Sequence, residues 1–388
     1  MKIALCSKGN FSLEKGFTKN RIELAEGLRK LGWETLLIDK QVLGIPSEER
    51  YHASKYGLAL KEYLIEHAYK YDVVLYEYDT LPFDRSLFSK STLFVARPAI
   101  LAYHFPLIKF RYNLKTKLSH WYRNFINTFK SNKGVNNSYE RIDYCLSQSD
   151  LIQVQNQKDR DLLVTRGFST DKIIIVPNGI STERIAKFNS SLRTYQEPFT
   201  VAFVGTFDFR KGAMDFPLLL RILKKRFPSI KLKLLGTRGM FYSSAQVLRF
   251  FPKKYHTDIE VVPKFDSEDL PNLLDSCHIG VFPSYLESFG FGALEMMCSG
   301  LPVIAYDVPG PSDFVLPELL APIGDYATLS EKIILLLEHR ELLEQKAVQV
   351  REAVISNYCW EDIARKVDAN YRFYLNRLQE VLVIQENR

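Results

Sequence analysis

Two carboxylates, Glu287 and Glu295, stand eight positions apart in a stretch that also contains paired glycines, Gly290 and Gly292. A helix that starts near Phe289 has first-turn N–H groups free to donate, and glycines let backbone come close to a ligand. A diphosphate is the kind of ligand that such a helix start favours. The first carboxylate then lies at the lip of the loop and the second about two turns inside the helix. We expect Glu287 to reach sugar or phosphate and Glu295 to accept hydrogen bonds from ribose hydroxyls.

A second loop places two cations side by side. It follows an apolar run at 201–204, begins with Gly205 and contains Arg210, Lys211 and Gly212. Adjacent basic side chains are groups that can stabilise negative charge on a leaving group where no metal ion does so.

These residues resemble a known family. The pattern E-S-F-G-x-x-x-x-E, followed by M-x-x-G-x-P-V-I-A, is similar to the E-x7-E signature of family 4 glycosyltransferases. The resemblance implies an α/β chain of GT-B fold, with two Rossmann-like parallel-sheet domains facing a central cleft. It also implies retention of anomeric configuration, no cofactor and no metal. The loop from Gly205 to Gly212 is similar to the family's G-R-x-x-x-x-K-G loop, with Thr206 in place of the arginine and Arg210 as its substitute.

The site residues follow from this resemblance, position by position. The catalytic set is Glu287, Lys211, Arg210 and His104, and the donor-binding set is Gly16, Gly205, Arg210, Lys211, Ser288, Phe289, Gly290, Phe291 and Glu295. Gly16 matches the second glycine of a pair that the family often has before its first helix. The family's histidine commonly follows the strand expected at 92–96, where this chain has Arg97, with His104 further on. Either residue can take that place.

Apolar runs separated by turn residues predict two α/β halves. The expected strands are 2–6, 34–38, 72–76, 92–96, 149–154, 172–176, 201–204, 231–235, 259–262, 279–282 and 303–306, and helices are expected after the first strand, at 159–165, from 267, at 326–337 and from 360 to about 380. The predicted domains are 1–190, which would bind the acceptor, and 196–360, which would bind the nucleotide-sugar. By resemblance, 361–388 is a helix that packs back on the first domain.

The composition of the chain indicates the cellular compartment in which we expect the protein. Five cysteines, odd in number and without C-x-x-C spacing, indicate buried thiols in a reducing compartment. The apolar run at the start is too short for a signal peptide, and no stretch of 18 apolar residues occurs. We therefore expect a cytoplasmic protein, either free or peripheral at the inner face of the membrane. The single D-x-D, at 159–161, fits acid placement in a first helical turn and indicates no metal site.

A basic segment rich in aromatic residues runs from 87 to 139 and contains no Asp or Glu. Its cations are Lys90, Arg97, Lys109, Arg111, Lys115, Lys117, Arg123, Lys130 and Lys133. Such a segment suits an anionic membrane surface or an anionic glycan or lipid-linked acceptor, and a solvated basic loop is the alternative. Nucleic acid is not expected, because no binding module accompanies the segment.

The predicted function is a retaining transfer of sugar from a UDP- or GDP-sugar to a glycan or lipid-linked acceptor, in cell-surface polysaccharide or glycolipid synthesis. One alternative is a nucleotide-sugar epimerase or hydrolase, which would form no second sugar-bearing product. The other is an inactive protein that binds glycan or membrane, which Thr206 and the displaced histidine favour and the pair of glutamates with Lys211 disfavours.

Overall fold

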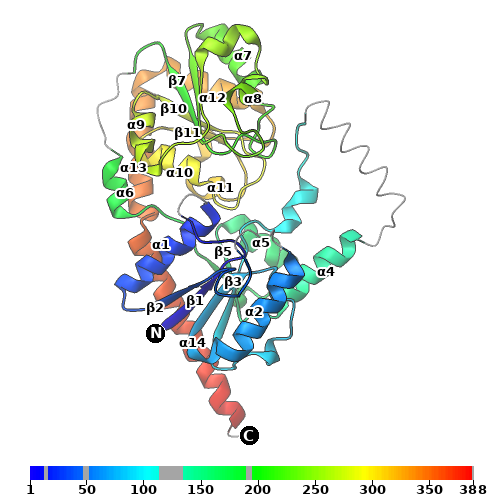
Figure 1. Cartoon of the computed structure of the whole chain (residues 1–388). Coiled ribbons are helices and arrows are strands. Elements are labelled where there is room, and N and C mark those ends of the chain that lie inside the picture. The colour runs from blue at the N-terminus through cyan, green and yellow to red at the C-terminus, as the bar shows by residue number, and fades with distance from the viewer. Residues whose placement is uncertain (13–15, 47–51, 113–133, 189–194, 387–388) are drawn as a thin grey trace. The chain divides into compact units, whose positions relative to one another are not determined.

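The computed structural model describes residues 1–12, 16–46, 52–112, 134–188 and 195–386, and its contacts divide the chain into two compact units (Figure 1). The first unit comprises Met1–Ala102, Ser131–Ser181 and Cys359–Arg388, and the second comprises Tyr103–Lys130 and Thr182–Tyr358. Each unit contains one parallel six-stranded sheet. The prediction of two parallel-sheet domains is confirmed.

The sheet of the first unit has the strand order β2-β1-β3-β4-β5-β6. Its strands are β1 (Lys2–Cys6), β2 (Glu34–Ile38), β3 (Val73–Glu77), β4 (Leu93–Arg97), β5 (Leu151–Val154) and β6 (Ile173–Ile175). Its helices are α1 (Gly16–Lys30), α2 (Ala53–His67), α4 (Gly134–Ser147), α5 (Gln157–Thr165) and α14 (Trp360–Glu386). The chain passes from β2 on one side of β1 to β3 on the other, so the order reverses between β1 and β3.

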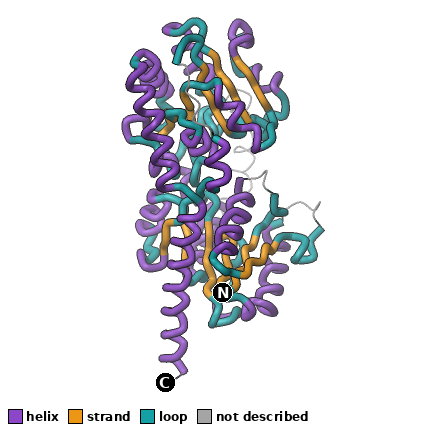
Figure 2. The backbone as a smooth tube through the Cα atoms, turned by 90° about the vertical axis from the view of Figure 1, so that its left-hand side faces the viewer, coloured by secondary structure: helices purple, strands orange, loops and turns teal. Residues whose placement is uncertain are grey.

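The core of the first unit depends on α14, the last helix of the chain. Ile363, Val367 and Tyr371 of α14 are buried against Leu24 and Leu28 of α1. Figure 2 shows α14 as the long helix near the C-terminus, beside the strands of this unit. Burial of this apolar face is the main contribution that holds α14 in place, because a helix gains its stability chiefly from packing.

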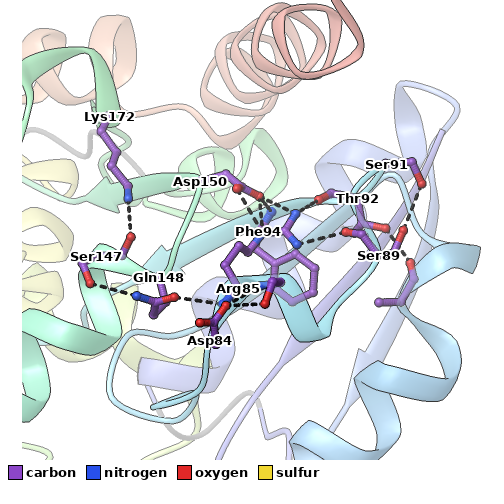
Figure 3. Close-up of polar contacts among 12 residues, drawn as sticks. Asp84, Arg85, Ser89, Ser91, Thr92, Phe94, Ser147, Gln148, Asp150 and Lys172 are labelled. Carbon is purple, nitrogen blue, oxygen red and sulfur yellow. Dashed lines mark hydrogen bonds and ion pairs between the residues drawn. The ribbon is translucent and has the colours of Figure 1, made fainter. Parts of the chain in front are cut away.

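A polar cluster holds the amino edge of the same sheet (Figure 3). The Arg85 guanidinium donates to both carboxylate oxygens of Asp150, at 3.0 and 2.9 Å, and to the Thr92 carbonyl at 2.7 Å. Asp150 also accepts from the Phe94 amide at 2.7 Å. Since β4 and β5 begin beside these residues, the cluster joins the starts of two neighbouring strands, at the edge opposite the carboxyl ends.

The sheet of the second unit has the order β12-β11-β10-β7-β8-β9. Its strands are β7 (Thr200–Val204), β8 (Lys231–Leu235), β9 (Ile259–Val262), β10 (Ile279–Phe282), β11 (Val303–Tyr306) and β12 (Leu320–Ala321). Counted from β7, this is the Rossmann order 3-2-1-4-5-6, in which the order reverses between the first and fourth strands. The reversal here lies between β7 and β10.

Helices cover this second sheet on both sides. The helices of this unit are α6 (Thr182–Lys187), α7 (Phe216–Arg226), α8 (Ser244–Leu248), α9 (Leu270–Asp275), α10 (Phe291–Cys298), α11 (Pro311–Phe314), α12 (Tyr326–Glu338) and α13 (Arg340–Asn357). Helix α7 packs with α12, whereas α10 packs on β7 and with α13. Helix α7 connects β7 to β8, and α10 connects β10 to β11, so the two connections run in opposite directions from the reversal point. Because crossovers between parallel strands are right-handed, α7 and α10 lie on opposite faces of the sheet.

The predicted strands are confirmed within one or two residues, and six of them agree at both ends. The helices predicted at 326–337 and from 360 are α12 and α14. Three long helices, α2, α4 and α13, are not predicted from the sequence.

The contact units differ from the predicted boundaries of 1–190 and 196–360 in two places. The second unit begins at Thr182, and it includes residues 103–130, which the prediction assigns to the first domain. In the described part of that segment, Arg111 forms an ion pair with Asp215. The helix predicted to pack on the first domain is α14, which belongs to the first unit.

Candidate active site

The residues predicted to bind the donor follow two adjacent strands at the reversal point of the second sheet. Gly205 comes directly after β7, and Pro283 directly after β10. In open α/β sheets, ligands bind outside the carboxyl ends of the strands at such a point. The topology therefore brings the loop at 205–212 and the loop at 283–290 to one place.

The two loops touch where Gly212 meets Pro283. Gly212 has φ +81°, and a Cβ atom on it would lie 2.3 Å from the Pro283 carbonyl oxygen. Only glycine combines this left-handed backbone with so close an approach. Tyr285 reinforces the contact, since its amide donates to the Arg210 carbonyl at 2.7 Å. The glycine after Lys211 thus has a structural reason: it brings the basic loop against the loop that carries Glu287.

Arg210, Lys211 and Glu287 form one charged cluster. The Lys211 ammonium pairs with the Glu287 carboxylate, and the Arg210 Nη1 lies 3.3 Å from Glu287 Oε1. Arg210 Nη1 also donates to the Leu286 carbonyl at 2.8 Å. Glu287 is 6% exposed. The three side chains sum to one positive charge, held beside the carboxyl ends of β7 and β10.

Burial and pairing set the protonation of this cluster. Burial alone raises the pKa of Glu287, but Lys211 and Arg210 outweigh it, so that the pKa lies below its ordinary value. The pKa of Lys211 is lowered, first by burial and also by Arg210, while Glu287 opposes the shift. Glu287 is therefore ionised at neutral pH and supplies the counter-charge that a buried Lys211 needs.

Thr206, at the position of the family's arginine, has a structural role in this loop. Its hydroxyl donates to Asp208 Oδ2 at 2.9 Å, and Asp208 Oδ1 accepts from the Lys211 amide at 2.9 Å. The loop is thereby closed on itself just before Lys211. Arg210, and not residue 206, supplies the guanidinium next to Glu287.

Helix α10 begins at Phe291, two residues later than the predicted start near Phe289. The reason is Gly290, which has the left-handed φ of +93° and cannot continue a helix from its N-terminal side. Ala293 and Leu294 donate their amides to the Gly290 carbonyl, so the amides ahead of them are the ones placed to donate to an anion.

The second glycine of this pair serves packing. A Cβ atom on Gly292 would lie 2.0 Å from the Val204 carbonyl oxygen, at the end of β7. The absence of a side chain lets the first turn of α10 rest on the strand. The interpretation that both glycines admit a ligand is thus changed: Gly290 provides a turn, and Gly292 provides a helix–strand contact.

The residues between the glutamates differ in exposure. Phe289 is buried among aromatic rings, with centroids of Phe291, Phe314 and Tyr358 at 5.2, 5.4 and 6.1 Å. Its side chain anchors the loop. Ser288, directly before it, is only partly buried.

Glu295 pairs with a residue that the sequence does not single out. Arg184 Nη2 of α6 lies 2.6 Å from Glu295 Oε1, and both side chains are about nine-tenths buried. Each glutamate of the pair therefore has its own basic partner, from a different loop or helix. No spacing rule connects Arg184 with Glu295, since the pair forms only when α6 and α10 meet in the fold.

The remaining predicted residues are dispersed. Gly16 is the first residue of α1. Arg97 ends β4 and is buried, donating to Asn20 Oδ1 at 3.0 Å and to Asn178 Oδ1 at 2.7 Å. His104 is buried and falls in the second contact unit. The structure thus brings Gly205, Arg210, Lys211 and the 287–291 loop together, whereas Arg97 and His104 belong to different units.

Two features are absent from the described residues, a metal-binding cluster and a membrane-spanning helix. No group of three or more His, Cys, Asp or Glu side chains is arranged to hold a metal ion in that part of the chain. None of the described helices has the length and apolar character needed to cross a membrane. Five cations of the basic segment, from Lys115 to Lys133, lie outside the described residues.

The fold is that of GT-B proteins. The structure is similar to a sucrose-phosphate synthase from Thermosynechococcus elongatus, with 19% identity, a TM-score of 0.69 and coverage of 97% of this chain and 99% of the synthase. It is also similar to Anabaena HepE in complex with UDP and glucose, with 16% identity, a TM-score of 0.65 and coverage of 95% and 99%. At such identities the likeness shows the architecture of two Rossmann-like domains.

Residues 185–353 match the family model described as Glycosyl transferases group 1. The match includes Arg210, Lys211, Glu287 and Glu295. Among curated proteins, YqgM of Bacillus subtilis, described as an uncharacterized glycosyltransferase, is 28% identical over 47% of this chain and 49% of its own length. CapM of Staphylococcus aureus, a capsular polysaccharide biosynthesis glycosyltransferase, is 21% identical over 58% and 62%. The chain thus matches about half of the first relative and somewhat more of the second.

Proposed function

We propose that the protein is a retaining glycosyltransferase that moves a sugar from a UDP- or GDP-sugar to a glycan or lipid-linked acceptor, in polysaccharide or glycolipid synthesis. The observation that carries the proposal is the Arg210–Lys211–Glu287 cluster at the reversal point of the second sheet. Its surplus positive charge suits a diphosphate. Support also comes from the group 1 match and from HepE, whose structure contains UDP and glucose.

In the proposed reaction, the acceptor hydroxyl enters on the face of the sugar from which the diphosphate leaves. The bond from the anomeric carbon to phosphate breaks, a new bond to the acceptor oxygen forms, and a leaving phosphate oxygen takes the acceptor's proton. Lys211 and Arg210, with the amides at the start of α10, stabilise the charge that develops on the diphosphate. No metal or other cofactor takes part.

The two glutamates have separate roles in this proposal. Glu287 keeps Lys211 charged through their ion pair and positions the sugar. Glu295 accepts from the ribose hydroxyls beside its ion pair with Arg184, since a carboxylate can accept several hydrogen bonds. Either Arg97 or His104 contacts the transferred sugar.

The basic segment at 87–139 is proposed to meet an anionic membrane at its inner face. Of its four described cations, Arg97 is buried and Arg111 is paired with Asp215, which leaves Lys90 and Lys109 as the exposed ones. Sedimentation with anionic liposomes at low and moderate salt tests this proposal. Absence of binding at low salt contradicts it, because electrostatic attachment is strongest there.

Donor recognition is tested by thermal shift with UDP-, GDP- and ADP-sugars on the wild type, Lys211→Met and the exposed control Lys253→Met. A donor present at a hundred times its dissociation constant stabilises the folded protein by about 2.7 kcal/mol. We expect stabilisation of the wild type and the control by one donor and a much smaller response of Lys211→Met. If no donor stabilises the folded wild type, the proposal fails.

Turnover then separates transfer from the alternatives. Loss of one group that stabilises the developing charge lowers kcat by about 100-fold or more, so Lys211→Met is expected to lose transfer to that extent. A free sugar or an epimerised donor as the sole product identifies a hydrolase or epimerase. Donor binding without any turnover identifies a binding protein.

A further inference from the structure

A cavity of about 550 Å³ lies in the second unit, against the loop at 283–290. One wall is the segment Leu107–Arg111, and the opposite wall consists of Tyr285, Ile323 and Gly324. Tyr285 stands two residues before Glu287, and its amide donates to the Arg210 carbonyl. The cavity and the charged cluster therefore share a wall.

Arg111 fastens the first wall to the unit. Its Nη1 lies 3.2 Å from Asp215 Oδ1, its Nη2 donates to the Gly324 carbonyl at 3.3 Å, and its guanidinium lies 4.9 Å from the Tyr326 ring centroid. The rings of Phe110 and Tyr285 are 6.0 Å apart. The segment is thus braced on both sides of the cavity.

Asp215 is the counter-ion of Arg111. Asp215 is fully buried and accepts hydrogen bonds from the hydroxyls of Tyr285 and Tyr306, at 2.7 and 2.8 Å. A buried carboxylate requires a counter-charge, which Arg111 provides. The lining otherwise holds one more cation, Lys109, and no Asp or Glu among the described residues. The cavity as a whole therefore favours a ligand that carries negative charge near Lys109.

The lining also contains large apolar side chains, some of which are open to solvent. Leu107 is 70% exposed and Ile323 is 43% exposed, and Ile108 and Phe110 lie between or beside them. Large apolar side chains so exposed around one cavity indicate that something apolar covers them. Pockets of this volume enclose ligands of about the size of a drug molecule.

We infer that this cavity binds the acceptor, and that the acceptor is an amphiphile with an apolar chain and a phosphate group. The chain contacts Leu107, Phe110 and Ile323, and the phosphate pairs with Lys109. Along Leu107–Arg111, apolar side chains and cations follow one another, so that one ligand with an apolar chain and a phosphate can contact both kinds. This inference rests on the proposed function, because an acceptor is expected beside the loop at 283–290 only if that loop binds a sugar donor.

Isothermal titration with octyl phosphate, below its micelle concentration, tests the inference. The variants are Lys109→Gln, Leu107→Ser and the control Lys253→Gln, an exposed lysine of the same unit outside the cavity. We expect the wild type and the control to bind alike, and each cavity variant to bind about tenfold more weakly. Octyl glucoside, which lacks the charge, and inorganic phosphate, which lacks the chain, are each expected to bind far more weakly than octyl phosphate.

Other outcomes overturn the inference. Equal binding by the wild type and both cavity variants removes the cavity as the site. Inorganic phosphate binding as tightly as octyl phosphate shows a simple anion site, and an equal loss in Lys253→Gln shows general attraction to a basic protein. If a nucleotide-sugar binds and octyl phosphate does not, this inference fails while the proposed function stands. If no nucleotide-sugar binds, the proposed function itself fails.

Discussion

Glu287 and Lys211 show how a buried pair keeps a loop charged. Each would lose its charge more readily in isolation, because burial penalises the ionised form. Together they hold one another ionised, and Arg210 adds the charge that makes the cluster net positive. Both cations of this loop thus pair with a carboxylate that lies about 75 positions further along the chain.

This pair predicts a pH dependence of stability. The pKa of Glu287 is lowered in the folded protein, so near and below its ordinary value of 4.5 the unfolded chain binds more protons than the folded one. The stability that Glu287 contributes is therefore fully present above pH 4.5 and is lost as pH falls through the folded pKa. Urea unfolding of the wild type and Glu287→Gln between pH 7 and pH 3 measures it. The wild type is expected to be the more stable at pH 7, with the difference shrinking below pH 4.5; a constant difference contradicts the pairing.

Helix α10 is positioned by what its first turn lacks. Gly292 lets the helix rest on the end of β7, and Gly290 turns the chain sharply into it. The loop at 283–290, which carries Glu287, leads into this turn. Its position relative to β7 therefore depends on both glycines. A shift of α10 would carry the helix start away from the Arg210–Lys211 loop.

Gly292→Ala is expected to be strongly destabilising. The new methyl group would overlap the Val204 carbonyl, and because backbone cannot move aside cheaply we expect a loss of about 3 kcal/mol in the free energy of unfolding. Gly44→Ala is the control for backbone strain without a steric overlap, since Gly44 has φ +68° and open space around it. That substitution should cost only about 1 kcal/mol of backbone strain. Equal losses in the two variants would show that the helix–strand contact is unimportant.

The chain as a whole alternates between its two units. The first unit is assembled from three separate segments and the second from two, so neither is a continuous piece of sequence. The apolar core of the first unit joins α1, near the start of the chain, to α14, near its end. Its stability must therefore respond to changes in α14, although more than 300 residues separate the two helices.

Two isoleucines of α14 test this dependence. Ile363 is 1% exposed in the core, whereas Ile384 is 55% exposed on the same helix. Ile363→Ala is expected to lower the unfolding free energy of the first unit by about 3 kcal/mol, and Ile384→Ala to change it by less than about 0.5 kcal/mol. Chemical denaturation of both variants measures the difference. Similar values would mean that α14 is not part of this core.

The sequence predicts the sheets better than the contacts between loops. Strands such as 2–6 and 279–282 are short apolar runs bounded by turn residues, so they are visible locally. The predicted start of α10 lies two residues too early because Gly290 adopts a left-handed turn that a spacing rule does not reveal. The sequence assigns neither Arg184 nor Arg111 to a site, because their partners Glu295 and Asp215 lie about 100 positions away and meet them only in the fold.

The late position of α14 also bears on how the protein is made. On a ribosome that adds roughly 5–20 residues per second, α14 is synthesised roughly 10–35 seconds after β6, the last strand of the first sheet. During that interval the apolar face of α1 that includes Leu24 and Leu28 has no covering helix. The apolar surface of the nascent first unit therefore stays exposed while the whole of the second sheet is translated. Binding by a chaperone during translation would be most useful over this interval.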